Sequence, residues 1–310
     1  MTDVLDVTES YLALRRTVAA FEYHRDVYSV RGADAVSYLQ GQLSADVAAL
    51  GIGEQVWSLL LAPQGKVVAW LRASRTADDE IVLDVDGGSG PAVVERLERF
   101  KLRVDAVIEP LPWRCIALRG PETSTVDLSG VDAVVVAPVD WRGLPGVDLL
   151  GPAVELPDGV AVSDILAVHN VRVEQGWPAM GHELDDTVIP GEAGQWLIDT
   201  SVSFTKGCYT GQELVARIDS RGNNTPRNLR GLVLAANVLP PVGAEIVVDG
   251  EVRGELTSVG ESLDLRAPIA LGFVHRSVDV PCDAVLRWAA PEGSIGEAAA
   301  QIRDLPLLTD

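Results

Sequence analysis

The alternation of apolar and polar residues predicts short strands and helices that do not follow a regular β-α-β order. Val36, Leu39 and Leu43 recur at helical spacing, and residues 93–100 carry a second apolar stripe behind Pro91. We therefore expect two helices in this part of the chain. Strands are expected at residues 27–30, 56–61, 67–73, 81–85, 115–118 and 133–139, the second and third forming a hairpin.

The pattern of apolar residues along the chain changes after Pro226. Upstream, a helix capped by Ser163-Asp164 ends near Gly176, and the turn signals in residues 179–204 predict a loop. Downstream, short apolar runs separated by turns predict a small β-barrel, with Asp249-Gly250 as a hairpin turn. The expected barrel strands are residues 229–234, 244–248, 252–259, 269–275 and 284–288.

Antiparallel hairpins accompanied by helices define an α+β fold class. We place the domain boundary at residue 225, so that residues 1–225 form an α+β region of two intertwined subdomains and residues 226–310 form the barrel. Neither a GxGxxG after a strand nor a GxxxxGK[ST] occurs in the sequence, so dinucleotide and P-loop functions have no support.

The composition is that of an acidic globular protein. Its 310 residues are 47% apolar, which is enough for a core, and the length corresponds to about two domains. The net charge of -20 disfavours a nucleic-acid partner. Cys115, Cys208 and Cys282 form no CxxC pair, so we expect neither a disulfide framework nor a resident metal site. With no signal peptide or membrane span in view, we expect a cytoplasmic protein without a membrane partner.

The segment Lys206–Glu213 (KGCYTGQE) holds the densest chemical information. Thr210 and Glu213 have the spacing of a capping box, which predicts a helix that begins at about residue 211. Cys208 then lies just before a helix N-terminus and two residues from a lysine. Both features favour the thiolate over the thiol, so Cys208 is a candidate nucleophile.

The same part of the chain is locally basic. Between residues 206 and 230, five basic residues face two acids, Glu213 and Asp219, which gives a local charge of +3 and predicts a site for an anion. The ordinary alternatives are that the capping box only marks the start of a helix and that Cys208 is a small buried residue. The five basic residues are Lys206, Arg217, Arg221, Arg227 and Arg230.

Residues 206–213 resemble the signature of the YgfZ-type folate-binding proteins, which support assembly or repair of iron–sulfur clusters. That family is related to the glycine cleavage T-protein, a tetrahydrofolate-dependent aminomethyltransferase. Three further segments resemble the family in the same order, and together they cover most of residues 27–225. They are residues 39–46 (LQGQLSAD), 100–103 (FKLR) and 172–178 (RVEQGWP).

The resemblance implies an aminomethyltransferase-like ring of subdomains around a central channel that receives tetrahydrofolate, followed by the β-barrel. Glu174 matches the carboxylate that pairs with the pterin ring, although the residues alone describe it as a solvated helix position. Cys208 would be the reactive thiolate, and client iron–sulfur proteins or assembly factors would be the partners. Lys206 and Arg217 would meet the anionic tail of the folate. The other cofactor-binding candidates are Arg172, Tyr209 and Gln212.

One departure from the T-protein pattern bears on catalysis. Where that pattern has two aspartates on the return strand of the early hairpin, this chain has Ala69-Trp70, and neither can act as a general base. Three functions stay open: folate-dependent support of iron–sulfur enzymes, a one-carbon (aminomethyl) transferase or oxidase, and a non-catalytic scaffold with a relic folate pocket. Trp177 and Trp196 could stack on a pterin or pack in the core, and His182 could line the pocket.

Overall fold

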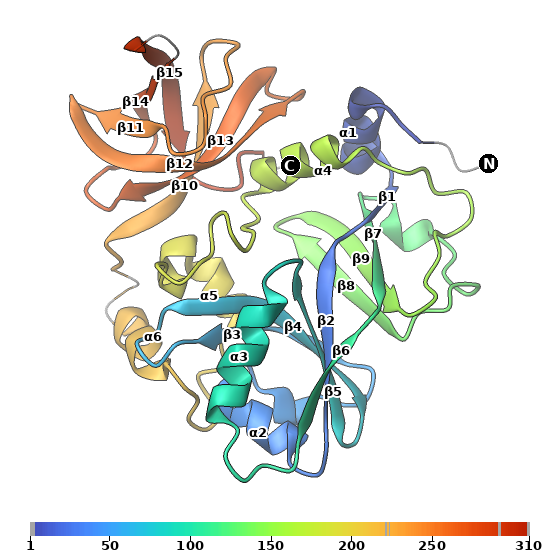
Figure 1. Ribbon diagram of the computed structural model, residues 1–310. Coiled ribbons are helices and arrows are strands. Elements are labelled where there is room, and N and C mark those ends of the chain that lie inside the picture. The colour runs from blue at the N-terminus through green and yellow to red at the C-terminus, as the bar shows by residue number, and fades with distance from the viewer. Residues whose placement is uncertain (1–3, 221, 223, 291–292, 309–310) are drawn as a thin grey trace.

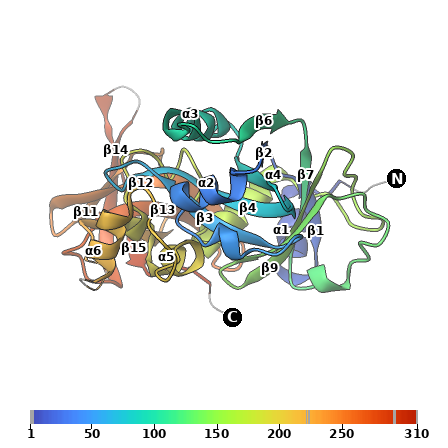
Figure 2. The ribbon, with the colours of Figure 1, turned by 90° about the horizontal axis from the view of Figure 1, so that it is seen from below.

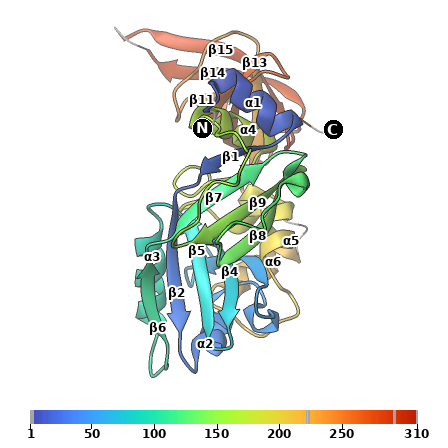
Figure 3. The same cartoon turned by 90° about the vertical axis from the view of Figure 1, so that its right-hand side faces the viewer.

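A computed structural model describes residues 4–220, 222, 224–290 and 293–308. Three β units surround a common centre (Figure 1): a five-stranded sheet, a four-stranded sheet and a closed six-stranded barrel. Helices α1 (Val7–Arg16) and α4 (Ile165–Gln175) lie between the barrel and the two sheets (Figure 3). Mixed helices and antiparallel strands of this kind confirm the α+β class predicted from the sequence.

The five-stranded sheet has the order β3-β4-β5-β2-β6 and is antiparallel throughout. The hairpin predicted around residues 63–66 is present as β3 and β4. Strand β6 contains Pro110 and lies at the sheet edge, where a missing backbone N–H costs no ladder hydrogen bond. The strands are β2 (Arg25–Arg31), β3 (Gln55–Leu61), β4 (Val67–Ala77), β5 (Glu80–Asp86) and β6 (Val107–Leu111).

Two helices accompany this sheet and match the apolar stripes seen in the sequence. Helix α2 (Ala35–Gln42) buries Tyr38 and Leu39, and α3 (Gly90–Phe100) buries Val93 and Leu97. Helix α3 packs against β2, β4 and β5 and is seen along the side of the sheet in Figure 2. Their apolar faces form one core with the sheet.

The four-stranded sheet has the order β1-β7-β9-β8. Its edge strand β8 alternates strictly between buried and exposed residues, which is the pattern of a strand with one face on the core. The strands are β1 (Ala19–Glu22), β7 (Arg114–Arg119), β8 (Val135–Trp141) and β9 (Leu144–Gly151), and a short 3-10 turn, η2 (Thr123–Thr125), follows β7.

Helix α4 has the boundaries that its capping residues predict. The side chain of Asp164 accepts a hydrogen bond from the backbone N–H of Leu166 at 2.7 Å. The helix ends at Gly176, whose φ of 62° is the left-handed conformation that glycine adopts without strain. Helix α1, which was not anticipated, packs along α4 and is itself started by a capping box between Asp6 and Glu9.

The loop predicted for residues 179–204 is wrong in its second half. A 3-10 turn, η3 (Pro190–Ala193), is followed by helix α5 (Gln195–Ser201). The helix forms because Leu197 and Ile198 are buried in the central core, a tertiary contact that local turn signals do not contain.

The barrel follows the predicted strands and closes with one that was not predicted, β15. Asp249 and Gly250 connect β11 to β12 with positive φ values of 52° and 79°, as a two-residue hairpin turn requires. Strand β15 pairs with both β14 and β10 and so removes the open edges. The strands are β10 (Arg227–Leu234), β11 (Glu245–Val248), β12 (Glu251–Ser262), β13 (Ala267–His275), β14 (Cys282–Ala289) and β15 (Ile295–Arg303).

Candidate functional site

Glu174 is completely buried, so its description as a solvated helix residue is wrong. It lies in the last turn of α4, where Tyr11 of α1 donates a 2.6 Å hydrogen bond from its hydroxyl to Oε1. The nearest charged nitrogen to Oε2 is Nε of Arg15, at 3.9 Å, which is too far for a hydrogen bond. Oε2 therefore has no hydrogen-bond donor, although it is buried.

The surroundings of Glu174 oppose its ionisation. Burial raises the pKa of the carboxyl above its ordinary value, against hydrogen bonds from Ser262 and Tyr11 and the charge of Arg15. Burial and the same carboxylate raise the pKa of the Tyr11 phenol. A buried carboxylate with an unused oxygen is a good acceptor for a ligand that brings N–H donors.

Tryptophans from all parts of the chain meet at the centre of the ring. Trp70 of β4 stacks on Trp57 of β3 at 4.4 Å between ring centroids and lies 4.7 Å from Trp177. Trp177 in turn contacts Trp141 at 5.8 Å and Trp196 at 5.5 Å. The indole N–H groups of Trp141 and Trp196 are buried without a hydrogen-bond partner. These five side chains are called the tryptophan cluster below.

Trp70 stands where the T-protein pattern has an acid. It is 2% exposed, and its indole N–H donates to the hydroxyl of Ser201 at 2.9 Å. Its neighbours are aromatic, so this part of the centre is an apolar surface and not a pair of carboxylates. Trp177 and Trp196 pack in the same cluster and belong to the central core.

On the other side of α4, Arg172 joins this helix to Glu183 and to strand β12 of the barrel. Its guanidinium donates to the carboxylate of Glu183 at 2.8 Å and to the hydroxyl of Ser258 at 2.7 Å. Burial opposes ionisation of Glu183, but the charge of Arg172 and hydrogen bonds from Ser258 and Thr257 hold its pKa below the ordinary value. The sequence did not single out Glu183, because its partner Ser258 is 75 residues away.

Lys206 caps the C-terminal end of helix α2. Its ammonium group donates to the backbone carbonyls of Gln40, Leu43 and Ala45 at 2.6, 2.6 and 2.8 Å. A lysine has three N–H donors, so all of them are used within the protein. Burial lowers the pKa of Lys206 to about 8. The ring centroid of Tyr209 lies 5.3 Å from the ammonium nitrogen of Lys206, and Tyr209 is 7% exposed.

The helix after the signature begins one residue later than predicted, and the capping box does not form. Helix α6 (Gln212–Asp219) has Gly211 at its N-cap with a φ of 85°, and no side chain caps it. The carbonyl Oε1 of Gln212 accepts instead from the backbone N–H of Tyr209 at 3.2 Å. Cys208 is exposed on the loop before this helix, as is Arg217 on the helix itself.

The predicted site residues fall into two separate groups. Glu174 and Arg172 lie on α4, in the upper half of Figure 1, whereas the signature segment lies against α2 and runs into α6 at the lower left. The five basic residues have different environments: Arg227 pairs with Glu192 and Arg230 with Asp304, and Arg221 lies outside the described residues. The structure therefore gives no single basic cluster among those that it describes.

A buried chain of charges joins the two sheets, and the sequence analysis missed it. Arg72 donates to Asp84 at 3.0 Å and to Asp148 at 2.8 Å, and Asp148 also pairs with Arg119 at 2.7 Å. Arg25 reaches Asp84 from β2 at 2.7 Å. Burial opposes ionisation of Asp148, yet Arg119 and Arg72 hold its pKa near 2. The alternating charges are satisfied by one another, which gives this chain a structural role.

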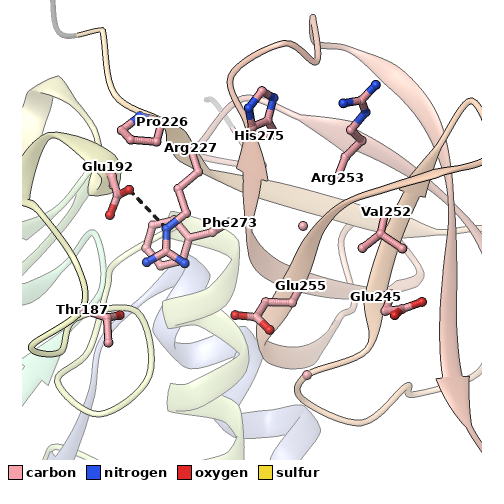
Figure 4. A pocket seen from close by; sticks show the side chains of 12 residues that line it. Thr187, Glu192, Pro226, Arg227, Glu245, Val252, Arg253, Glu255, Phe273 and His275 are labelled. Carbon is pink, nitrogen blue, oxygen red and sulfur yellow. Dashed lines mark hydrogen bonds and ion pairs between the residues drawn. The ribbon is translucent and has the colours of Figure 1, made fainter.

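A wide cavity of about 700 Å³ lies where η3 and the loop before it face the barrel (Figure 4). Arg227 crosses it, with its guanidinium 4.3 Å from the ring centroid of Phe273 and 3.2 Å from the carboxylate of Glu192. Glu245 and Glu255 border the cavity from the barrel side. Its lining carries charges of both signs, so it shows no preference for one ligand.

The fold and the comparisons agree on the class of protein. The model of the glycine cleavage T-protein C-terminal barrel domain matches residues 227–293. The crystal structure of the glycine cleavage system aminomethyltransferase T from Bartonella henselae superposes with a TM-score of 0.77 and 20% identity, over 99% of this chain and 91% of that one. The chain thus has an aminomethyltransferase-like fold, as the resemblance predicted.

Sequence similarity to curated proteins points in the same direction. The chain is 26% identical to an aminomethyltransferase of Streptomyces avermitilis, over 88% of this chain and 82% of that protein. It is 25% identical to an aminomethyltransferase of Symbiobacterium thermophilum, over 94% and 88%. An uncharacterised protein of Haemophilus influenzae is 28% identical over 63% of this chain and 66% of its own length. The protein is therefore T-protein-like.

Two further findings concern only the described part of the chain. None of its helices has the length and apolar character needed to cross a membrane. Its histidine, cysteine and acidic side chains do not converge in threes as metal ligands would.

Proposed function

We propose that this T-protein-like protein binds a tetrahydrofolate and, with it bound, supports the assembly or repair of iron–sulfur clusters in client enzymes. The observation that carries the folate part is the buried carboxylate of Glu174, whose Oε2 has no donor. A pterin carries an aminopyrimidine edge with N–H groups of the kind that such an oxygen accepts. The similarity to aminomethyltransferases over most of the chain supports the same ligand, since the T-protein that the sequence resembles is tetrahydrofolate-dependent.

The residues around Glu174 fit the other properties of a folate. Trp177 of the tryptophan cluster lies three residues later in the chain, and the aromatic ring of a pterin would pack against this cluster. The unpartnered indole N–H groups of Trp141 and Trp196 are donors for polar atoms of a ligand. Tetrahydrofolate would supply a carrier of one-carbon units. Glu174 would orient the pterin, and the tryptophans would exclude water from it.

Cys208 supports the second part of the proposal. Its thiol is exposed on the loop that Lys206 anchors to helix α2, so a partner protein has access to it while the loop stays in place. The exposed thiol and the folate region lie in different parts of the molecule, so binding of folate and contact with a client need not compete. A thiolate at this position would be a transient ligand to iron, or would attack a disulfide of the client to form a mixed disulfide and release the client's other sulfur as a thiolate.

Aminomethyl transfer is the second candidate, because the named curated relatives are aminomethyltransferases. The structure provides little for that reaction at the hairpin, since Trp70 fills the position of the expected acid and is held by Ser201. A tryptophan neither takes up a proton nor stabilises a developing cation by charge. We therefore place ligand binding ahead of transfer chemistry.

The first test is anaerobic calorimetric titration of tetrahydrofolate into wild-type protein and Glu174→Gln. The variant should bind about tenfold or more weakly, because a charge-assisted hydrogen bond contributes about 1.5–3 kcal/mol. Glu192→Gln is the matched control: it is also a buried glutamate, but its partner is Arg227 at the barrel cavity. Equal binding to all three proteins would remove Glu174 from the site, and absence of binding to wild type would leave the scaffold function.

The second test measures an iron–sulfur enzyme in cells that lack this protein and receive a variant. Cys208→Ala should fail to restore the enzyme's activity, whereas Cys282→Ala, a half-buried thiol in the barrel, should restore it. Full restoration by Cys208→Ala would contradict a role for this thiol. Restoration by a Glu174→Gln, Cys208→Ala double variant would favour the non-catalytic scaffold.

A further inference from the structure

A small cavity of about 300 Å³ opens at the C-terminal end of α4, next to Glu174. Its polar wall consists of Arg15 of α1, Arg142 of the β8–β9 turn and Gln175 of α4. Its remaining walls are largely apolar and include Leu144 and Pro306. Two guanidinium groups thus face a space that is lined elsewhere by hydrocarbon.

Arg142 brings the first guanidinium group to the cavity. Its guanidinium donates to the backbone carbonyls of Leu305 at 2.6 Å and Gly176 at 3.4 Å, and it lies 5.0 Å from the ring of Trp196. In the part of the chain that the structure describes, it forms no ion pair with a carboxylate. Burial lowers its pKa to about 10, so it is still charged at neutral pH. A guanidinium has five N–H donors, and two are used here.

The backbone holds Arg142 in an unusual conformation. Its φ is 52°, in the left-handed region that long side chains rarely adopt, and the adjacent Gly143 has a φ of 105°. A glycine or asparagine would fit the turn with less strain. An arginine at this position therefore needs a compensating interaction of its side chain.

Arg15 brings the second group of donors. Its side chain is 11% exposed, and Nε lies 3.8 Å from the carboxylate of Asp264 and 3.9 Å from that of Glu174 without making a hydrogen bond. With its amide oriented by its neighbours, Gln175 accepts from Arg15 and donates to the carbonyls of Trp141 and Arg142 at 3.3 and 3.2 Å. Gln175 thereby fixes the positions of both arginines relative to each other.

We propose that this cavity binds a short-chain organic carboxylate, with its charged end between Arg15 and Arg142 and its carbon chain against the apolar wall. An anion would compensate the buried charge of Arg142 and use its free donors, since planar guanidinium groups match carboxylate geometry. The apolar wall favours an organic anion over a bare inorganic one. Two sources share this chemistry: a free dicarboxylate and the glutamyl tail of a folate.

The probe is glutarate, a five-carbon dicarboxylate, titrated calorimetrically in the absence of folate and at constant ionic strength. Wild-type protein should bind glutarate at least tenfold more tightly than glutaramide, its neutral diamide, and than inorganic phosphate. Arg142→Gln should weaken glutarate binding at least tenfold. No preference for glutarate over glutaramide in wild type would overturn the proposal.

Arg142 also holds two backbone carbonyls, so a second variant keeps the test decisive if Arg142→Gln does not fold. Leu308→Glu places a carboxylate in the cavity wall at a half-buried position and should weaken glutarate binding at least tenfold while the protein stays folded. Arg253→Gln is the control, since this arginine borders the other cavity and is paired with Glu251. Glutarate binding that is equal in Leu308→Glu and Arg253→Gln would overturn the assignment.

The source of the carboxylate follows from competition. If tetrahydrofolate displaces bound glutarate, the cavity receives the folate tail. If it binds without displacing glutarate, the cavity takes a free carboxylate, and the anion site is separate from the folate site. Either result supports the assignment of the cavity to a carboxylate, and the glutarate titration itself does not depend on folate binding.

Discussion

The hydroxyl of Tyr11 donates a 2.6 Å hydrogen bond to Oε1 of Glu174, across 163 residues of sequence. This contact joins helix α1 to helix α4, and the backbone N–H of Asp264 donates to the same hydroxyl at 3.2 Å. The N-terminal helix therefore covers the carboxylate that we assign to the folate. Access to Glu174 therefore depends on how firmly the hydrogen bond from Tyr11 holds α1 in place.

Tyr11→Phe should lower the free energy of unfolding by about 1–3 kcal/mol, because the buried carboxylate of Glu174 then loses the hydrogen bond from the phenol. Chemical denaturation followed by circular dichroism measures this change. Tyr209→Phe is the control, since Tyr209 is a similarly buried tyrosine outside this contact. An unchanged denaturation midpoint for Tyr11→Phe would show that the bond contributes nothing to stability.

Glu174→Gln should become more stable relative to wild type as the pH rises above the ordinary carboxyl value of 4.5. The folded-state pKa of Glu174 is raised, so the folded protein binds this proton more tightly than the unfolded chain, and stability is lost as the proton leaves. Each unit by which the pKa is raised corresponds to about 1.4 kcal/mol at neutral pH.

Glu183→Gln should show the opposite pH dependence of the free energy of unfolding, measured for both variants by chemical denaturation at a series of pH values. The folded-state pKa of Glu183 is lowered, so its contribution to stability is present at neutral pH and is lost as the pH falls through that value. The Gln variant should therefore lose stability relative to wild type as the pH rises from acid to neutral. Parallel pH profiles for the two variants would contradict both pKa directions.

Trp70→Asp should destabilise the fold by about 3–5 kcal/mol or more, although it introduces the acid of the T-protein pattern. The substitution removes a large buried ring from contact with Trp57 and Trp177 and buries a carboxylate beside them. Tryptophan fluorescence and the denaturation midpoint report the change. Trp70→Phe keeps an aromatic ring and should cost less; a stable Trp70→Asp protein would show that the centre has room for charge and solvent.

Iodoacetamide should modify Cys208 in the native protein and Cys115 only after unfolding. Cys208 is exposed, whereas Cys115 is 2% exposed and burial raises the pKa of its thiol. Mass spectrometry of peptides taken at increasing times gives the order of modification, and Cys208→Ser should abolish the early product. Early modification of Cys115 would mean that the four-stranded sheet opens under native conditions.

Local sequence patterns were sufficient to predict the elements whose boundaries are set by residues close together in the chain. The β3–β4 hairpin, helix α4 with its Asp164 and Gly176 caps, and the Asp249-Gly250 turn all occur where the sequence predicts them. In each case the necessary residues lie within a few positions of one another. The capping box at Thr210 did not form because the helix begins one residue later, with Gly211 at the N-cap in a left-handed conformation.

The sequence by itself determined the α+β class, most strands of the barrel and the resemblance that singled out Glu174 and Cys208. Only the tertiary structure decided that Glu174 is buried under Tyr11, that Trp70 belongs to an aromatic centre, and that Lys206 is used by helix α2. The reason is physical: burial, charge compensation and unused donors depend on residues that are distant in sequence. Arg142 shows this most clearly, since only the folded arrangement of the described residues reveals that none of their carboxylates pairs with it.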